Sequence, residues 1–182
     1  DIIKKNNLNR QILFGFKDLG KKKVRVAKER LLETNPYANI QSFNKKIIKN
    51  NLNLLKNSSI IIDTSDNWTT MKLINNFCLL NKIPLLSSSV AAYDIQVALF
   101  ENNSNKHLCL DCIFPNDSEP KLARCDTVGI LGSAAGLAGV ISAQKTINFL
   151  MKFNQNNNIL TLINTKTLSV NQINIDKNSK CK

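Results

Sequence analysis

The sequence predicts an α/β domain with a mixed β-sheet, and three observations carry this prediction. The segment SIIIDTSDN (59–67) is an apolar run that ends in carboxylates, which is the pattern of a buried parallel strand. A helical pattern and a second apolar run, IPLLSSSVA (83–91), follow closely and predict a right-handed β–α–β unit. Two alternating segments, 159–164 and 168–175, predict a C-terminal β-hairpin.

Before this unit, the sequence predicts mostly short elements. Residues 1–16 read as a loop that leads into a short helix. Residues 20–36 predict a helix, because Val24, Ala27 and Leu31 recur on one face and Asn35-Pro36 ends the pattern. The alternation in ANIQSF (38–43) predicts a strand, and 44–57 is ambiguous, with room for a short helix.

Three further elements complete the prediction. Residues 68–82 form a helix whose apolar face carries Met71, Ile74, Phe77 and Cys78. Residues 94–101 alternate like a strand. Residues 133–153 form a helix with a small-residue N-terminal half, and its glycine spacing in 129–139 mimics a phosphate loop. Close helix packing explains the small residues better, because the G-x-G-x-x-G pattern is missing.

Composition narrows the classes of function. The 182 residues suit one domain, and no apolar run reaches the roughly 18 residues that span a bilayer, so we expect no membrane association. The net charge is +12, but 21 of the 25 basic residues are lysines scattered among Asn and Ile, which favours a solvated face. With one Trp and two Tyr, the chain lacks the basic–aromatic interleaving of nucleic-acid binders.

Polar residues gather where the two predicted parallel strands end. Asp66 and Asn67 follow the first strand, and Ser87–Ser89 lie at the end of the second. Ligands bind at the C-terminal ends of strands in such sheets. A carboxylate there can hold Mg²⁺ on a nucleotide phosphate, and it can equally cap the following helix, so both roles of Asp66 stay open at this point.

Five cysteines, an odd number with one tight pair, favour thiol or metal chemistry in a reducing compartment. The pair Cys109 and Cys112 is typical of half of a structural zinc site, and a buried or redox-active pair is the alternative. Cys125 follows Arg124, which would activate a thiol, but the following Asp126 opposes this. Cys78 lies on an apolar helix face and is expected in the core. The only histidine, His107, is expected in a loop beside the cysteine pair.

Four motifs in order resemble one family over essentially the whole chain. They are NNLNRQILF (6–14), DLGKKKVRVAKERLLETNP (18–36), IIIDTSDN (60–67), and CLDC (109–112) with the terminal NSKCK (178–182). They are similar to the motifs of the ThiF/MoeB/HesA family, the adenylyltransferases that activate ubiquitin-like proteins. The resemblance implies a Rossmann-like ATP-binding fold and a cytoplasmic homodimer.

The resemblance also implies roles for the matched residues. Arg10 and Lys23 would stabilise the phosphates of ATP and the charge at the α-phosphorus, and Asp66 would hold Mg²⁺. The nucleotide site would be lined by Asn6, Asn7, Gln11 and Asn67, together with the three charged residues just named. Zn²⁺ would be bound by Cys109, Cys112, Cys181 and a fourth cysteine about two residues beyond Lys182.

The implied reaction is adenylylation of the C-terminal glycine carboxylate of a small β-grasp sulfur carrier, which gives an acyl-adenylate and pyrophosphate. The stretch CIFPNDSEPKLARC (112–125) resembles the ThiF-like branch, which activates the carrier ThiS for thiazole and thiamine biosynthesis. Some members of this branch link a cysteine covalently to the carrier, which maps onto Cys125. The alternatives are MoeB-like adenylation of the molybdopterin synthase small subunit, and a non-catalytic remnant that binds a ubiquitin-like partner.

Two departures from the family pattern shape the expected domain. We expect residues 1–182 to be one adenylyltransferase domain that lacks its N-terminal glycine-rich nucleotide-binding unit, which would lie upstream of Asp1 together with the ribose-binding acidic residue. The small-residue strand end of the family reads SSSVA (87–91) here. The 182 residues alone are therefore not expected to bind ATP well.

Overall fold

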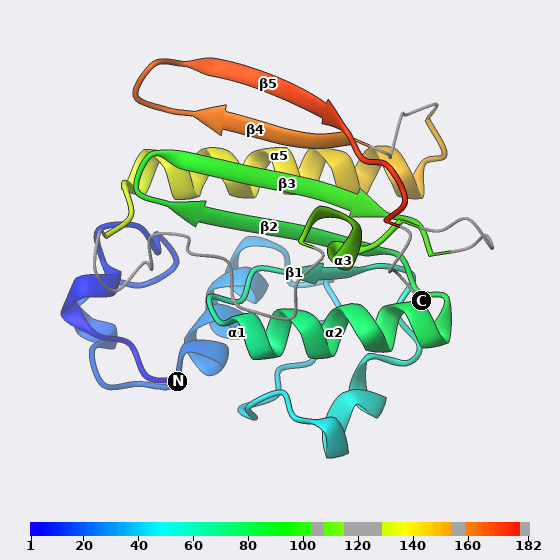
Figure 1. Ribbon diagram of the computed structural model, residues 1–182. Coiled ribbons are helices and arrows are strands. Elements are labelled where there is room, and N and C mark those ends of the chain that lie inside the picture. Colours follow the sequence, from blue (N-terminus) through cyan, green and yellow to red (C-terminus); the bar gives the residue numbers. More distant parts are fainter. Residues whose placement is uncertain (103–107, 115–128, 154–158, 179–182) are drawn as a thin grey trace. The chain divides into compact units, whose positions relative to one another are not determined.

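The computed structural model describes residues 1–102, 108–114, 129–153 and 159–178 (Figure 1). The chain divides into two compact units, which we call the first unit (residues 1–46) and the second unit (residues 47–182). Among the described residues, no helix is both long enough and apolar enough to cross a membrane.

The first unit contains two short 3-10 helices, η1 (Lys5–Asn7) and η2 (Phe16–Asp18), and the helix α1 (Lys23–Thr34). The segment before α1 is a closed loop, because the N–H of Ile3 donates to the carbonyl of Lys21 at 2.9 Å and the N–H of Gly20 donates back to Ile3 at 2.9 Å. At this closure Gly20 has a φ of 80°, a conformation that residues with a Cβ atom disfavour.

The structure confirms the helix predicted at 20–36 but places its buried face differently. Val26 is buried, whereas the predicted core residue Leu31 is 42% exposed. The strand predicted at 38–43 is wrong, because this segment is extended without strand pairing. A strand needs a hydrogen-bonded neighbour, and no described strand pairs with these residues.

The second unit is built on a mixed five-stranded sheet of order β1-β2-β3-β4-β5. β1 (Ile61–Asp63) and β2 (Leu85–Ala91) pair in parallel, and the remaining neighbours are antiparallel. The other strands are β3 (Asp94–Phe100), β4 (Ile159–Asn164) and β5 (Ser169–Asn174). This topology confirms the β–α–β unit and the C-terminal hairpin, although β1 is shorter than the predicted apolar run.

Each face of this sheet carries its own hydrophobic cluster, because successive strand residues point to opposite faces. On one face, Leu86 and Leu99 pack against α5 (Gly132–Leu150), which lies along the sheet in Figure 1. On the other face, Leu85 and Phe100 pack against α2 (Trp68–Asn81). The short 3-10 helix η3 (Lys49–Leu55), within the ambiguous segment 44–57, adds Leu52 to the second cluster.

The small residues of α5 serve close packing, as the sequence predicts, but the alanines rather than the glycines do so. Ala134 and Ala138 are buried against the sheet. Gly136 and Gly139 are exposed, and a Cβ atom added to either would meet nothing within 4 Å. Only the alanine positions therefore limit the size of the side chain.

The C-terminus of α2 generates the first testable prediction. Lys82 adopts a left-handed conformation with a φ of 54°, and its N–H donates to the carbonyls of Cys78 and Leu79. Glycine adopts this conformation without the steric cost that other residues bear. We expect Lys82→Gly to raise the free energy of unfolding by about 0.5–1 kcal/mol in denaturant titrations.

The matched control for Lys82→Gly is Asn76→Gly, at an exposed position inside the same helix. There glycine should lower the free energy of unfolding by about 0.3 kcal/mol, because glycine favours the helix less than asparagine does and no left-handed strain is relieved. Equal losses in both variants would contradict the prediction.

Candidate active site

The turn that follows β1 assigns separate tasks to neighbouring polar residues. Asp63 is buried, and its carboxylate accepts the N–H of Ser65 at 2.9 Å, which fixes the turn. Asn67 is the N-cap of α2, since its side-chain oxygen accepts the N–H of Thr70 at 2.8 Å. The capping role that the sequence left open for Asp66 therefore belongs to Asn67, and Asp66 is exposed at the strand end.

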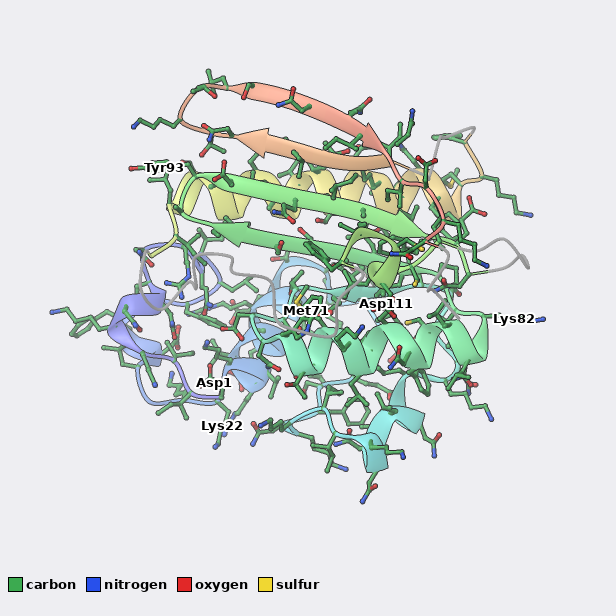
Figure 2. The ribbon with its side chains drawn as sticks, in the orientation of Figure 1. Asp1, Lys22, Met71, Lys82, Tyr93 and Asp111 are labelled. Carbon is green, nitrogen blue, oxygen red and sulfur yellow. The ribbon has the colours of Figure 1, made fainter. Side chains whose placement is uncertain are left out.

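A cleft of about 430 Å³ in the second unit begins beside Asp66. Its polar end is formed by Ser65, Asp66, Ser87 and Ser89. Ser87 and Ser89 lie inside β2, which continues to Ala91, and not at the end of the strand as the sequence predicted. The rest of the lining is mostly apolar and comes from β3, β4, α2 and the short helix α3 (Leu110–Ile113). These apolar residues include Met71 (labelled in Figure 2), Ile95, Ala98, Leu110, Ile113, Phe114, Leu160 and Leu162.

Ser65 and Trp68 are two residues of this cleft that the sequence analysis did not single out. The hydroxyl oxygen of Ser65 is buried and has no hydrogen-bond partner among the described residues. Such an oxygen is costly to bury unless a ligand or water pairs with it. Trp68 opens α2 directly after the strand end, and that position is the signal that could have identified it.

In the first unit, Arg10 and its neighbours form a local polar turn. The guanidinium of Arg10 donates to the carbonyl of Asn6 at 2.7 Å and to the side chain of Asn9 at 3.1 Å. Asn7 is buried, and its side-chain oxygen accepts the N–H of Lys4 at 3.0 Å. The Asn7 side chain therefore stabilises the turn, independently of any contact with a ligand. The side-chain oxygen of Gln11 is buried without a hydrogen-bond partner among the described residues.

The three consecutive lysines of the KKK run have different surroundings. Lys21 forms an ion pair with Asp18 at 2.9 Å. Lys22 is exposed and is labelled near Asp1 in Figure 2. Lys23 is the first residue of α1, and its ammonium lies 2.6 Å from the carboxylate of Asp1. Among the three, Lys23 is thus the one fixed at the start of the helix.

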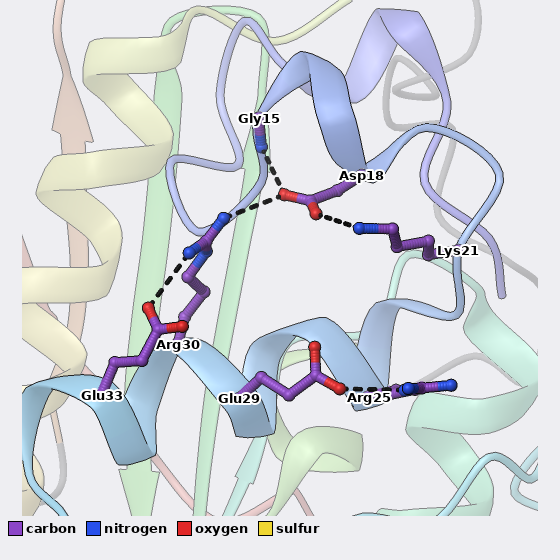
Figure 3. Close-up of polar contacts among 7 residues, drawn as sticks. All are labelled: Gly15, Asp18, Lys21, Arg25, Glu29, Arg30 and Glu33. Atoms are coloured by element: carbon purple, nitrogen blue, oxygen red, sulfur yellow. Dashed lines mark hydrogen bonds and ion pairs between the residues drawn. The ribbon is translucent and has the colours of Figure 1, made fainter.

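Asp18 organises the loop that joins Arg10 to Lys23 (Figure 3). Its side chain is only 4% exposed and accepts the N–H of Gly15 at 3.0 Å. Lys21 lies 2.9 Å from one carboxylate oxygen, and Arg30 of α1 lies 3.5 Å from the other. The Gly15 hydrogen bond and then the Lys21 ammonium lower the pKa of Asp18 to about 2.

The lowered pKa of Asp18 predicts acid sensitivity with a defined sign. The unfolded carboxyl has a pKa of about 3.9, so its stabilising effect is complete above about pH 4 and is lost as the pH falls towards 2. We expect Asp18→Asn to reduce the stability at pH 7 and to flatten the dependence of unfolding on pH between 4 and 2. Urea titrations over this range measure both effects.

The control for Asp18→Asn is Glu29→Gln, which breaks the exposed ion pair between Arg25 and Glu29 in the same unit (Figure 3). Exposed pairs contribute little, so this variant should match the parent protein. An unchanged pH dependence in Asp18→Asn would contradict the prediction.

The paired cysteines lie on one turn at α3. Cys109 is the N-cap and is buried, and the N–H of Cys112 donates to the Cys109 carbonyl at 2.9 Å. Two cysteines on one turn fit half of a tetrahedral thiolate site. No group of three potential ligands exists among the described residues. The third predicted zinc ligand, Cys181, lies outside those residues, as do Cys125, which is predicted to link to the carrier, and the predicted loop residue His107.

Cys78 is a core residue, as the sequence predicts. It is fully buried in the cluster between α2 and the sheet. Burial, and then the neighbouring Asp63 carboxylate, raise the pKa of the Cys78 thiol to about 12. The burial and the raised pKa are those of a core thiol rather than of a reactive one.

The structure thus groups the predicted residues by unit. Asp66 and Asn67 lie at the polar end of the cleft region in the second unit. Arg10, Gln11 and Lys23 lie in the first unit, on and beside the loop that Asp18 fixes. The joint approach of these two sets to one nucleotide stays a prediction.

The fold and the residues described above define an α/β protein whose candidate site lies beside the C-terminal end of β1, at the parallel pair β1–β2. The model of the ThiF family matches residues 1–182, and the chain belongs to this family. It is 33% identical over 182 residues to a probable molybdopterin-synthase adenylyltransferase of Pyropia yezoensis, with 96% of this chain and 47% of the relative covered.

A second relative is the sulfur carrier protein adenylyltransferase of Thermus thermophilus, at 28% identity with 83% of this chain and 58% of the relative covered. The chain spans about half the length of the curated relatives it matches. Among solved structures, E. coli MccB with ATP matches all of this chain and 56% of its own, with a TM-score of 0.82 and 19% identity. This likeness confirms the Rossmann-like fold.

Proposed function

We propose that the protein carrying this chain is an ATP-dependent adenylyltransferase that acts on the C-terminal glycine carboxylate of a small β-grasp sulfur carrier. One observation carries the proposal: Asp66 stands exposed at the strand end, beside an apolar cleft, while Asn67 caps the helix in its place. Membership of the ThiF family and the adenylyltransferase relatives support it.

The cleft suits the extended C-terminal tail of such a carrier. An apolar lining of about 430 Å³ that ends in serines and a carboxylate can hold a short peptide with its terminus at the polar end. The charged lining residues, Asp66 and Asp94, are both acidic. A carboxylate and a polyphosphate beside Asp66 therefore need cationic groups from elsewhere, and the family motifs assign this task to Arg10, Lys23 and Mg²⁺.

The donor set at Asp66 fits a magnesium ion. Mg²⁺ prefers oxygen ligands and usually takes one or two carboxylates together with substrate phosphates. The Asp66 carboxylate and the unpartnered Ser65 hydroxyl supply oxygens at the strand end. When bound, the ion would offset negative charge on the phosphates. Asp66 would hold it, and Asn6, Asn7, Gln11 and Asn67 would contact the nucleotide around it.

The reaction needs little proton transfer. A carboxylate oxygen of the carrier forms a bond to the α-phosphorus of ATP, and the bond from that phosphorus to the oxygen of the leaving pyrophosphate breaks. The nucleophile is already ionised, so Arg10 and Lys23 act by orienting the phosphates and stabilising their charge. No residue of the chain is required as a general base.

Within this activity we favour a ThiS-type carrier and thiazole synthesis for thiamine. The support is the stretch 112–125, which resembles the ThiF-like branch. The Cys125 thiolate would then attack the acyl carbon of the acyl-adenylate, forming a thioester with the carrier and releasing AMP. The molybdopterin synthase small subunit is the second candidate, because two of the relatives are named after that synthase. A cytoplasmic homodimer belongs to the same proposal.

The nucleotide chemistry generates a prediction for Lys23 and Asp66. In the full-length protein, carrier-dependent exchange of labelled pyrophosphate into ATP should fall at least about 100-fold in Lys23→Ala, because a charge that stabilises the transferring phosphoryl group is lost. Asp66→Asn should show a similar loss, with part of the activity regained at high Mg²⁺. Exchange rates with ThiS-type and molybdopterin-synthase-type carriers identify the partner.

Lys22→Ala is the matched control for Lys23→Ala, because it removes the same charge from the neighbouring exposed residue. It should retain near-parental exchange. Exchange that is absent with every carrier ending in Gly-Gly, while a labelled carrier still binds, would favour the non-catalytic remnant instead.

The cysteine pair generates a prediction of zinc content. We propose that Cys109, Cys112 and Cys181 bind Zn²⁺ with a fourth cysteine just beyond Lys182. The full-length protein should then contain about one zinc per chain by mass spectrometry of metals. Cys109→Ser and Cys112→Ser should each lose the metal, since two thiolates of the turn are required.

Cys78→Ser should keep its zinc, because Cys78 is buried in the core between α2 and the sheet. Parental zinc content in both Cys109→Ser and Cys112→Ser would sink the assignment.

A further inference from the structure

Three side chains of α2 contact the short helix α3, which lies more than thirty residues further along the chain. Trp68, Lys72 and Asn75 are spaced four and three residues apart, so they share one face of α2. α3 comprises only Leu110–Ile113. A helix of this length is not stable on its own, so its formation and position depend on contacts with other parts of the protein.

The polar part of this contact is a clamp formed by Lys72, Asn75 and Asp111, of which Asp111 is labelled in Figure 2. Asn75 is 1% exposed, and its side-chain oxygen accepts the N–H of Leu110 at 3.0 Å. Its amide donates to the Asp111 carboxylate at 3.5 Å, and the Lys72 ammonium forms an ion pair with the same carboxylate. The N-cap residue Cys109 provides no side-chain cap, so Asn75 satisfies an N–H that the helix leaves unpaired.

The apolar part of the contact is a wall of the cleft. The rings of Trp68 and Phe114 meet edge to face, with centroids 5.6 Å apart and an interplanar angle of 88°. The Lys72 ammonium lies 5.7 Å from the centroid of the Trp68 ring. Trp68, Leu110, Ile113 and Phe114 all line the cleft. The clamp therefore holds the residues whose other sides face the cleft.

We propose that Lys72, Asn75 and Asp111 are positioning residues that determine how tightly the cleft binds the carrier tail. This inference rests on the proposed function, in which the cleft receives that tail. The three clamp residues are not among the described residues that line the cleft, and they differ from the residues that the family motifs assign to ATP. Loosening it should weaken binding of the tail and leave binding of the nucleotide unchanged.

The first test is Asn75→Ala in the full-length protein, assayed by pyrophosphate exchange. This variant leaves the buried N–H of Leu110 without its acceptor, so the KM for the carrier should rise on the order of tenfold. The KM for ATP should stay at the parental value. Asn76→Ala is the matched control, since it alters the same residue type one position on, at an exposed site.

The second test reverses the charges of the ion pair between Lys72 and Asp111. It does not require that the buried position of Asn75 tolerate a substitution. Lys72→Asp should raise the KM for the carrier, because it places two carboxylates together. The double variant with Asp111→Lys should restore it, since the pair is rebuilt with opposite polarity. A merely structural role would not give this recovery together with an unchanged KM for ATP.

The third test measures binding without catalysis. Trp68 is the only tryptophan of these 182 residues, and it lines the cleft. A peptide with the carrier's C-terminal sequence should change its fluorescence, and the midpoint should shift about tenfold in Asn75→Ala. Trp68→Phe identifies the share of the signal that comes from this residue.

The outcomes separate the two proposals. Absent exchange in the parental protein with every carrier would refute the proposed function, and the peptide titration would still decide the role of the clamp. Parental exchange with the same carrier KM in Asn75→Ala, Lys72→Asp and Asn76→Ala would overturn the clamp. Failure of Lys72→Asp to recover in the double variant would likewise overturn it.

Discussion

The parallel pairing of β1 with β2 is the constraint on which the second unit depends. Its register sets Asp63, the last residue of β1, opposite Ser87 inside β2, so the turn after β1 lies beside the serines of β2. The connection through α2 places the N-terminus of that helix there as well. One pairing thus brings together a buried carboxylate, an exposed carboxylate, the serines of β2 and the capped end of a helix.

Adjacent residues have different roles at this edge of the sheet, and this division leaves the Asp66 carboxylate exposed. Asp63 accepts a hydrogen bond within the turn, and Asn67 accepts one at the start of the helix. Asp66 is therefore not needed as the acceptor of either bond. The first unit shows the same arrangement. Asp18 engages Lys21 and Arg30, which fixes the loop and leaves Lys23 to the start of α1. In both places a buried carboxylate holds the backbone near a predicted site residue: Asp66 in one case, and Lys23, which pairs with Asp1, in the other.

The sequence predicts the long elements because their periodicity is strong. The apolar face of residues 68–82 was sufficient to predict a helix, and the alternation in 94–101 was sufficient to predict a strand. The position of Asp66 followed from the predicted end of the strand before it. The segment 38–43 alternates too, but alternation cannot supply a pairing partner, and no described strand provides one. The wall of the cleft could not be predicted from the sequence for a related reason. The contacts of Asn75 with Leu110 and of Lys72 with Asp111 join residues 35 and 39 positions apart, and no local pattern records them.

Under the proposed function, the structure would separate two demands of adenylylation. Charge neutralisation would fall to the loop that Asp18 fixes, because the charged residues of the cleft lining are acidic in a chain whose net charge is +12. Placement of the carrier tail would fall to the wall that α2 holds against α3. Since no described residue belongs to both the Asp18 network and the clamp, changes in one should alter nucleotide binding and changes in the other carrier binding. A substitution that alters both equally would have to act through the β1–β2 edge, where Asp66 lies.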